Sequence, residues 1–474
     1  MGSMSLRFRN TLGGELQPFQ PLEAGKVGLY TCGPTVYAPA HVGNFRSFVF
    51  ADLLRRYLQW SGYSVTWVLN ITDVDDKLIR RAAAEGLGIT ELADRYAERF
   101  REDMRLLGIG PPDVMPRATA HIDEMVALIR QLLERGHAYR TDDGSVFFSI
   151  DSWPAYGRLA RLDPEQQRVG ERVEADEYAK DDVRDFALWK GPKPGEPSWS
   201  TAIGEGRPGW HIECSAMSMK YLGASLDLHT GGIDLVFPHH EDEMAQSEAA
   251  TGQRFVSVWM HCAHLRMGGQ KMAKRTGNLA LPEDMYAEGV PPRVLRYALL
   301  STHYRTGPDF TEASLATAAS SVERLSTVLL TLDAYREERD DDPSLTPLLE
   351  ETYQAFRSHM DDDLNIAPAL GAVFDLVREL NRRLADRGLS TADAVRAAEA
   401  LRDLDRVLAV VEDEVAPVPD AAVQRLLDLR VAARAERDWT RSDALRAELA
   451  ALGVTVEDTA DGQRWRRSTE PVHG

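Results

Sequence analysis

Residues 26–72 carry the pattern that most restricts the fold of this chain. The run 26–32 (KVGLYTC) alternates apolar residues with others as a strand does, and residues 64–72 (SVTWVLNIT) are rich in the β-branched and aromatic types of a second strand. Between them, apolar residues recur at helical spacing from Phe45 to Trp60, and Gly62 stands where such a helix ends. A strand, a helix and a strand in so short a stretch predict a βαβ unit, whose strands pair in parallel through a right-handed crossover.

Two more apolar strands are expected near the middle of the chain, at 225–236 and 255–261. Before them, residues 87–135 have a charged helical pattern, and residues 137–210 are irregular and rich in turns, which we interpret as an insertion. The predicted fold class is therefore α/β, with a Rossmann-type parallel-sheet catalytic core that is interrupted by an insertion.

From Pro291 onward the sequence is almost entirely amphipathic helix, with a polar break at 339–346 and a Pro-containing break at 414–420. The two breaks predict a helical bundle that is followed by a small separate unit. In that unit we expect helices at 421–435 and 441–452, and then a hairpin of 453–456 with 463–467.

Composition and charge exclude several classes of protein. With 474 residues, 43% of them hydrophobic and 27% charged, the chain is an ordinary folded one with several domains, and its three cysteines are too few for a disulfide framework. No apolar run is long enough to span a membrane and the start lacks a signal peptide, so we expect reduced thiols in a cytoplasmic protein. The net charge of −19 argues against bulk coating of nucleic acid, but residues 421–474 balance nine arginines with nine acidic residues, and a local contact is expected there.

Two short motifs fit phosphate chemistry. His41-Val42-Gly43-Asn44 stands at the start of the first helix, where backbone amides attract phosphate, a glycine allows close approach and a histidine can donate a hydrogen bond. Lys271-Met272-Ala273-Lys274-Arg275 puts three cations in five residues behind Gly268-Gly269, and such a loop can close over a triphosphate. Taken alone, the first motif is more often a capping turn and the second a solvated basic loop.

A third group combines metal-binding residue types: Cys32, Cys214, His239 and Glu243. His239 and Glu243 are four residues apart in an expected helix over 239–250 (HHEDEMAQSEAA), so their side chains leave the same face. Two thiolates, an imidazole and a carboxylate form a tetrahedral set that suits Zn²⁺. Distant cysteines without a C-x-x-C spacing are more often buried hydrophobic residues, so the metal is a hypothesis at this point.

Other residues near these groups are expected to have structural roles rather than catalytic ones. The acidic run 73–76 (DVDD) ends the second strand and is expected to be a solvated turn rather than a cation site. His211 and His240 adjoin proposed ligands and are interpreted as outer partners of the ligands or as structural residues. Cys262 has no partner pattern and is expected in the core.

Together these segments closely resemble the cysteinyl-tRNA synthetases, which are class I aminoacyl-tRNA synthetases. The resemblance covers essentially the whole chain, including Arg437-Asp438-Trp439 and Trp465-Arg466-Arg467 near the end. In the family the first motif is usually His-Ile-Gly-His and the second Lys-Met-Ser-Lys-Ser, from which Asn44, Ala273 and Arg275 depart. The matching runs are 32–37 (CGPTVY), 41–44 (HVGN), 70–77 (NITDVDDK), 209–217 (GWHIECSAM), 231–241 (GGIDLVFPHHE), 271–278 (KMAKRTGN) and 360–365 (MDDDLN).

The resemblance implies a reaction in two steps. The carboxylate of L-cysteine attacks the α-phosphate of ATP, which is accompanied by Mg²⁺, to give cysteinyl-adenylate and pyrophosphate; the 3′-terminal ribose of tRNA(Cys) then takes the cysteinyl group. Both lysines of the second motif are retained, so the charge that offsets the leaving pyrophosphate is kept. By the same resemblance the catalytic residues are His41, Asn44, Lys271 and Lys274, and the ATP-binding residues are Pro34, His41, Gly43, Asn44, Gly232, Asp234 and Lys274.

The resemblance also implies one Zn²⁺ per subunit on Cys32, Cys214, His239 and Glu243, with the substrate thiolate as a further ligand. Serine differs from cysteine by one atom, and the fit of a cavity separates such near-isosteres only about a hundredfold. Zinc ionises a thiol far more readily than an alcohol, so the metal accepts cysteine alone and no editing domain is expected. The residues implied at the amino acid are Cys32, Gly33, Thr35, Thr72, Trp210 and His239.

The tRNA is expected to lie across the helical bundle, with its anticodon at the C-terminal unit, and the chain is expected to act as a monomer without a membrane partner. Guanidinium and aromatic planes suit single-stranded bases, and the residues expected to supply them are Arg437, Trp439, Arg464, Trp465 and Arg466. The expected domains are 4–120 and 211–265 for the two halves of the catalytic core, 121–210 for the insertion, 266–320 for the loop of the second motif and a stem-contact fold, 321–413 for a DALR-like bundle, and 421–474 for anticodon binding.

Two other interpretations stay open. A cysteine ligase of the mycothiol-pathway type resembles the same core and zinc site, but it joins cysteine to an amino-sugar and has no use for an anticodon reader, so the segments after residue 420 favour the synthetase. The altered second motif suggests a non-catalytic tRNA-binding paralogue. The retained lysines and the four metal-ligand types argue against that alternative.

Overall fold

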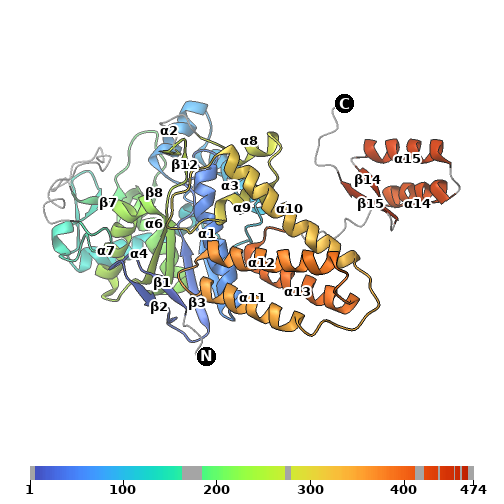
Figure 1. The fold of residues 1–474 in the computed structure, drawn as a ribbon. Coiled ribbons are helices and arrows are strands. Elements are labelled where there is room, and N and C mark those ends of the chain that lie inside the picture. Colours follow the sequence, from blue (N-terminus) through green and yellow to red (C-terminus); the bar gives the residue numbers. More distant parts are fainter. Residues whose placement is uncertain are drawn as a thin grey trace. The chain divides into compact units, whose positions relative to one another are not determined.

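The chain forms two compact units, Met1–Val411 and Glu412–Gly474 (Figure 1). The computed structural model describes residues 6–162, 184–272, 279–411, 421–435, 438–452, 454–459 and 462–467. The larger unit holds a parallel sheet, an insertion and a helical bundle, and the smaller unit holds two helices and a hairpin.

The centre of the larger unit is a four-stranded sheet of β3 (Lys26–Thr31), β4 (Ser64–Leu69), β10 (Leu226–Gly232) and β11 (Val256–Cys262). The strand order is β11-β10-β3-β4, and every neighbouring pair is parallel, so all four carboxyl ends lie at the same edge. Helix α1 (Val42–Trp60) joins β3 to β4 and buries its apolar face in the core. The predicted βαβ unit and parallel sheet are therefore confirmed.

The expectation that 137–210 is irregular is wrong, because much of this segment forms a second sheet. Three of its strands have only three residues, which is too short for an alternating pattern to show, and β7 is buried on both faces and does not alternate at all. The five antiparallel strands run in the order β5 (Ala138–Arg140), β6 (Val146–Phe148), β7 (Phe186–Lys190), β9 (Gly204–Pro208) and β8 (Trp199–Thr201).

Helices and turns connect and cover the two sheets. The apolar faces of α4 (Ile122–Glu134) and α6 (Trp210–Leu222) share a core with the insertion. The other elements before α6 are β1 (Arg7–Arg9), β2 (Leu16–Pro18), α2 (Asp76–Glu85), α3 (Ile89–Leu106), η1 (Ala118–His121) and η2 (Ile150–Ser152). Those after β10 are η3 (Ile233–Leu235), η4 (Val236–His240), α7 (Glu241–Thr251), β12 (Arg266–Met267), β13 (Gln270–Lys271), α8 (Pro282–Ala287) and α9 (Pro292–Leu300).

Four long helices complete the larger unit: α10 (Glu312–Ala334), α11 (Leu345–Met360), α12 (Ile366–Ala385) and α13 (Thr391–Leu408). They lie together on one side of the unit (Figure 1). Residues 335–344 connect α10 to α11, and α11 begins within the predicted polar break 339–346. One continuous apolar core runs from the sheet into the bundle. The bundle and the catalytic core therefore pack as one body.

The smaller unit has the elements that the sequence predicted. α14 (Ala421–Ala435) and α15 (Trp439–Ala451) pack on the hairpin of β14 (Val454–Thr459) and β15 (Gly462–Arg467). Its small core is made of Val423, Leu427, Leu449, Val454 and Val456.

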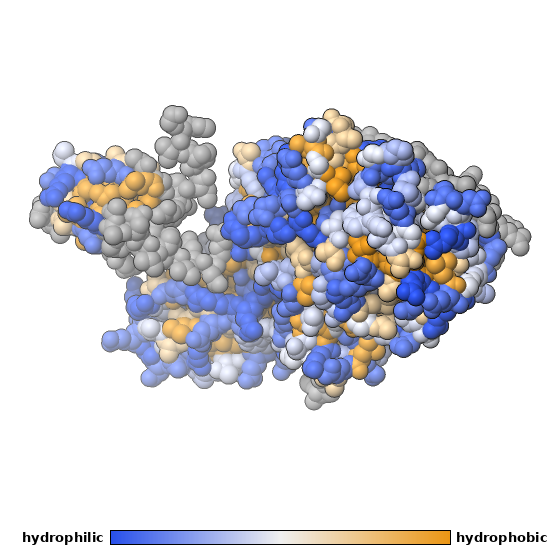
Figure 2. Space-filling view, turned by 180° about the vertical axis from the view of Figure 1, so that it is seen from behind, coloured by the Kyte–Doolittle hydropathy of each residue, from blue (hydrophilic) through white to orange (hydrophobic). Residues whose placement is uncertain are grey.

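One face of the larger unit is mainly hydrophilic. Figure 2 shows that hydrophilic residues cover most of this face of the larger unit and that hydrophobic residues form only scattered patches. None of the described helices combines the length and the apolar character that a membrane-crossing helix needs.

Candidate functional site

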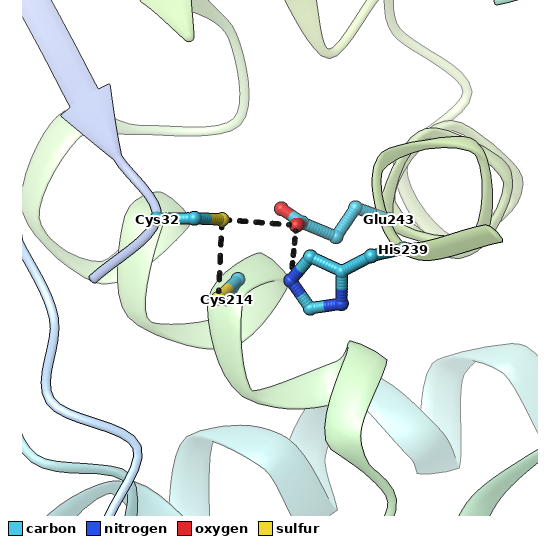
Figure 3. Close-up of side chains that lie close together, drawn as sticks. All are labelled: Cys32, Cys214, His239 and Glu243. Atoms are coloured by element: carbon cyan, nitrogen blue, oxygen red, sulfur yellow. Dashed lines mark hydrogen bonds and ion pairs between the residues drawn. The ribbon is translucent and has the colours of Figure 1, made fainter. Parts of the chain in front are cut away.

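Cys32, Cys214, His239 and Glu243 converge at the carboxyl edge of the parallel sheet (Figure 3). Cys32 directly follows β3, Cys214 lies on α6, and Glu243 lies in the first turn of α7. Cys32 Sγ is 3.6 Å from Cys214 Sγ and 3.5 Å from Glu243 Oε1, and His239 Nε2 is 3.0 Å from the same carboxylate oxygen. All four side chains are buried, and one ligand atom from each lies within 4.8 Å of the others.

The helix expected over 239–250 begins later than predicted. α7 starts at Glu241, and His239 lies in the tight turn η4 before it, in which Phe237 has an extended backbone. His239 and Glu243 nevertheless point toward each other, as the prediction of a shared face required (Figure 3).

The spacing of these four residues fits a bound metal. A tetrahedral Zn²⁺, with distances of about 2.3 Å to sulfur and about 2.0 Å to oxygen, holds two sulfurs about 3.8 Å apart and a sulfur and an oxygen about 3.5 Å apart. The corresponding separations here are 3.6 Å and 3.5 Å. Two thiols with one imidazole and one carboxylate are also a donor set that zinc accepts. The residues present therefore fit Zn²⁺.

The charges of the group are strongly coupled. Burial raises the pKa of the Cys214 thiol, but hydrogen bonds with Cys32 and His239 outweigh burial and lower this pKa to about 6. Burial likewise raises the pKa of Glu243, and the imidazoles of His229 and His239 lower it to about 2. For His239, burial lowers the pKa, and the Glu243 carboxylate raises it to about 10. Metal ligands must be deprotonated, so a bound cation displaces the proton that His239 otherwise holds.

Two further histidines contact two of the candidate metal ligands, Glu243 and Cys32. His229 Nε2 is 3.0 Å from Glu243 Oε2, and His240 Nε2 is 3.3 Å from Cys32 Sγ. These two histidines, with Cys32 and Glu243, also form a group whose ligand atoms lie within 4.8 Å of one another. The sequence analysis missed His229, because a histidine inside the apolar strand β10 looks like an ordinary core residue. Its position near the carboxyl end of a parallel strand was the available signal.

An aromatic ring covers the imidazole of His239. The Trp210 indole stacks on it with a centroid distance of 4.2 Å and an interplanar angle of 23°, and Trp210 is 37% exposed. His211 Nδ1 is 2.8 Å from His239 Nδ1, and His211 Nε2 is 3.3 Å from Asp242 Oδ2. The ligand ring is therefore oriented from two sides, while part of the indole stays accessible to a small molecule.

The segment after Cys32 lines the same region. The Gly33 amide donates to Asn70 Oδ1 at 2.8 Å, and a Cβ at Gly33 would lie 1.6 Å from the Asn70 carbonyl oxygen. Beyond it, the chain pairs in parallel through Thr35 and Thr72. The structure thus brings the predicted amino-acid residues Cys32, Gly33, Thr35, Thr72, Trp210 and His239 to one edge of the sheet.

The first phosphate motif forms the N-terminus of α1. His41 is the N-cap and accepts a hydrogen bond at Nδ1 from the Asn44 amide at 3.2 Å, while Asn44 Oδ1 accepts one from the His41 amide at 3.0 Å. This reciprocal capping box explains how asparagine serves at the fourth position of the motif. A Cβ at Gly232, at the end of β10, would lie 2.6 Å from Asp234 Oδ1 and 3.7 Å from Ser47 Oγ, so Gly232 faces α1 and Asp234, the next predicted ATP-binding residue, lies close to it.

The second motif and the segment after it also meet the start of α1. Met272 is buried, and its Sδ would be 3.6 Å from a Cβ placed at Gly43. On the far side, the Ala280 carbonyl accepts a hydrogen bond from the Val42 amide at 2.9 Å. Lys271 lies in β13, and Lys274 lies outside the described residues.

The interpretation of 73–76 as a solvated turn is wrong. Asp73 is buried and accepts hydrogen bonds from the Thr119 amide at 2.9 Å and hydroxyl at 2.7 Å. Asp75 caps α2, and Asp76 forms ion pairs with Lys190, at 2.8 Å, and Arg207. Asp73 therefore holds the chain after β4 to η1, and Asp76 connects the start of α2 to β7 and β9 of the insertion. Cys262 is buried in the core as predicted.

The predicted tRNA residues belong to the smaller unit. Trp439 is the first residue of α15 and is 55% exposed, with the Arg434 guanidinium 5.5 Å from its ring centroid. Arg464, Trp465 and Arg466 lie in β15, and Arg437 lies outside the described residues.

Comparisons with known proteins add independent evidence. Three family models match the chain: tRNA synthetases class I (C) catalytic domain at residues 18–320, DALR domain at 355–412, and cysteinyl-tRNA ligase anticodon binding domain at 416–466. The cysteine–tRNA ligase of Koribacter versatilis is 44% identical, and that of Halorhodospira halophila is 46% identical. Each alignment covers 98% of this chain and 100% of the relative.

Among solved structures, methionyl-tRNA synthetase of Mycobacterium tuberculosis in complex with methionyl-adenylate matches with a TM-score of 0.56 and 18% identity. This match covers 88% of this chain and 96% of that one. At so low an identity, the similarity shows a shared fold.

Proposed function

The chain belongs to the cysteinyl-tRNA ligase family of class I tRNA synthetases, and on this premise we propose that it activates L-cysteine with ATP and transfers the cysteinyl group to the 3′-terminal ribose of tRNA(Cys). The observation that carries the proposal is the buried group of Cys32, Cys214, His239 and Glu243 beside the phosphate motif of α1. One site holds a thiol and the neighbouring site holds phosphates, which is what adenylation of cysteine requires.

Cys32, Cys214, His239 and Glu243 would hold one Zn²⁺, which accepts the substrate thiolate and excludes serine. Trp210, beside His239, forms a wall of the amino-acid pocket, and Gly33, Thr35 and Thr72 form its floor. The N-terminus of α1 lies at the same edge of the sheet as these four residues, and there the carboxylate of the bound cysteine would meet the α-phosphate of ATP.

The chain's own groups bind and polarise ATP. The backbone amides at the N-terminus of α1, with His41 and Asn44, bind phosphate oxygens, and Pro34 and Gly43 leave room for the nucleotide. Gly232 and Asp234 hold the ribose, and Lys271 and Lys274 balance the pyrophosphate, with Mg²⁺ arriving on ATP.

For the second step, the smaller unit is proposed to bind the anticodon through Arg437, Trp439, Arg464, Trp465 and Arg466. The exposed indole of Trp439 beside Arg434 supports this, because unpaired bases stack on such planes. We propose that the anticodon-binding domain occupies 421–474 within this unit, and that it follows the catalytic core (4–120 and 211–265), the insertion (121–210), the second-motif and stem-contact segment (266–320) and the bundle (321–413). We propose a monomer that acts in the cytoplasm.

The test is charging of a tRNA that bears a GCA anticodon, with labelled cysteine and ATP, and with serine as the control amino acid. Charging specific to cysteine supports the proposal. Cysteine-dependent ATP–pyrophosphate exchange without charging would favour the amino-sugar ligase, and absence of both activities would favour the inactive paralogue. The match at 416–466 to an anticodon-binding model favours charging over either alternative.

A further inference from the structure

Arg46 has an unusual environment for an arginine so close to a phosphate motif. It lies on α1 two residues after Asn44, and it is only 1% exposed. Its guanidinium has five N–H groups, and five hydrogen bonds are formed. Nε donates to Ala263 O at 3.2 Å, Nη1 to Leu299 O at 2.7 Å and Thr302 Oγ1 at 3.4 Å, and Nη2 to His303 O at 3.1 Å and Thr306 O at 2.7 Å.

None of these five acceptors is a carboxylate. Four of them are backbone carbonyls, and Leu299 is in the last turn of α9, where the negative end of the helix dipole stabilises a cation. Burial lowers the pKa of Arg46, which measures the cost of placing the cation there. An apolar residue at position 46 would avoid the cost of burying a cation. The five hydrogen bonds of Arg46 therefore need a role that justifies this cost.

The contacted backbone supports the hairpin that precedes the second motif. The Ala263 amide donates to Tyr304 O at 2.8 Å, and the Arg266 amide donates to Pro308 O at 3.0 Å. Arg266 O in turn accepts from the Phe310 amide at 2.8 Å. Residues 299–310, which we call the support segment, therefore lie against the start of β12, and Arg46 holds the first half of this segment.

The same hairpin returns to the start of α1. The Met272 amide donates to Leu265 O at 3.2 Å, and the Met272 side chain packs near Gly43. These contacts form a closed loop, which we call the frame. Arg46 connects α1 to the support segment, the support segment contacts the start of β12, and Met272 contacts α1 again. A change in any of these contacts alters the distance between the two phosphate motifs.

We propose that Arg46 is a positioning residue for adenylation, which sets the separation between the phosphate-binding N-terminus of α1 and the hairpin that carries the second motif. The inference rests on the proposed function. Arg46 touches neither substrate; it acts through the backbone of Ala263 and of the support segment. Misplacement of reacting groups by about 1 Å costs up to about a hundredfold in rate, so a small shift of the frame is enough to be measured.

Arg46→Lys tests the role, because lysine keeps the charge but places its donors at one nitrogen and cannot span the acceptors on Ala263 and on the support segment. We expect the single-turnover rate of cysteinyl-adenylate formation, per active site, to fall about 10- to 100-fold. The KM for cysteine and the zinc content should stay at wild-type values, and so should the transfer of cysteine from preformed adenylate to tRNA. Active sites are counted by titration with labelled cysteine and ATP, so misfolded protein does not enter the rate.

Arg383→Lys is the matched control. Arg383 is also buried, but it lies on α12 and pairs with Glu379 and Asp342. This variant should lower the Tm with no change in the adenylation rate per site. As a second variant, Arg46→Ala should regain adenylation rate when methylguanidinium is added, because the cation can occupy the vacated space.

Three outcomes separate the hypotheses. If Arg46→Lys reduces the number of active sites while each surviving site reacts at the wild-type rate, Arg46 is only structural and the inference is overturned. If adenylation and transfer fall equally, the effect is not specific to the frame of the phosphate motifs, and the inference is again overturned. If the wild-type protein itself lacks cysteine-dependent adenylation, the proposed function fails rather than the role of Arg46.

Discussion

Replacing Gly33 by alanine should dismantle the metal site without touching any of its ligands. A Cβ at this position would lie 1.6 Å from the carbonyl oxygen of Asn70 and 2.7 Å from its carbonyl carbon, and both are backbone atoms that cannot rotate away. To restore even a tight contact of 3.0 Å, the two segments must separate by about 1.4 Å. Metal-ligand distances tolerate only about 0.2 Å, and Cys32 is the preceding residue.

We therefore expect Gly33→Ala to lower zinc affinity by at least 10- to 100-fold, the range found when the support of metal ligands is lost. Overpacking should also lower the free energy of unfolding by about 1–3 kcal/mol. Zinc per subunit after dialysis, cysteine-dependent pyrophosphate exchange and the denaturant midpoint measure these effects. Activity and zinc content should fall together.

Gly371→Ala is the matched control for the same chemical change. Gly371 is exposed on α12, and a Cβ there would meet nothing within 4 Å, so alanine should stabilise the helix by about 0.5–1 kcal/mol and leave zinc unchanged. A Gly33→Ala protein with a full zinc complement and the wild-type KM for cysteine would refute the reasoning, because it would show that the Asn70 backbone yields without disturbing Cys32.

Three further results are expected. Cys214→Ser should lower zinc content and cysteine activation together, since a neutral alcohol is a poor substitute for a thiolate ligand; full activity in a demonstrably zinc-free variant would contradict this. Deleting the residues after Pro419 should spare pyrophosphate exchange and reduce tRNA charging at least a hundredfold, because the larger unit has its own core; equal loss of both would point to a structural role for the smaller unit. Burial raises the pKa of Asp405 to about 6, so the folded protein binds the proton of this carboxyl more tightly than the unfolded chain does. The free energy of unfolding should therefore fall as the pH rises from about 4 to about 6. Asp405→Asn should remove that loss, which a larger gain in Tm at pH 7.5 than at pH 4 would verify.

The parts of the fold that the sequence predicted are those with local patterns. The βαβ unit of β3, α1 and β4 shows helical and strand periodicity over adjacent segments, and the hairpin after residue 453 is short and self-contained. The five-stranded sheet of the insertion was missed because β6 (Val146–Phe148) pairs with β7 (Phe186–Lys190), which lies far along the chain, and because three-residue strands carry no readable period.

The metal group shows a similar limit. Cys32 and Glu243 are separated by 211 positions, so no spacing rule could join them; the set was a hypothesis from residue types, which the family resemblance then supported. Sequence reasoning also placed the acids after β4 in solvent. Asp73 is buried there because Thr119, which is remote in the chain, offers two donors to its carboxylate. In both cases the sequence shows the residue types that can bind a metal or a proton donor, but it does not show which distant residues lie beside them in the fold.

The strand order explains why the thiol and phosphate sites are adjacent. From β3 the chain crosses to β4 on one side, and from β10 it crosses to β11 on the other, so the direction of winding reverses between β3 and β10. At such a switch point the loops after the two strands separate and leave a crevice. The loop after β3 carries Cys32 and leads to His41, and the loop after β10 carries Asp234 and leads to His239 and Glu243. Each loop therefore contributes residues to both proposed sites, so a cysteine bound at the first site would lie beside ATP bound at the second.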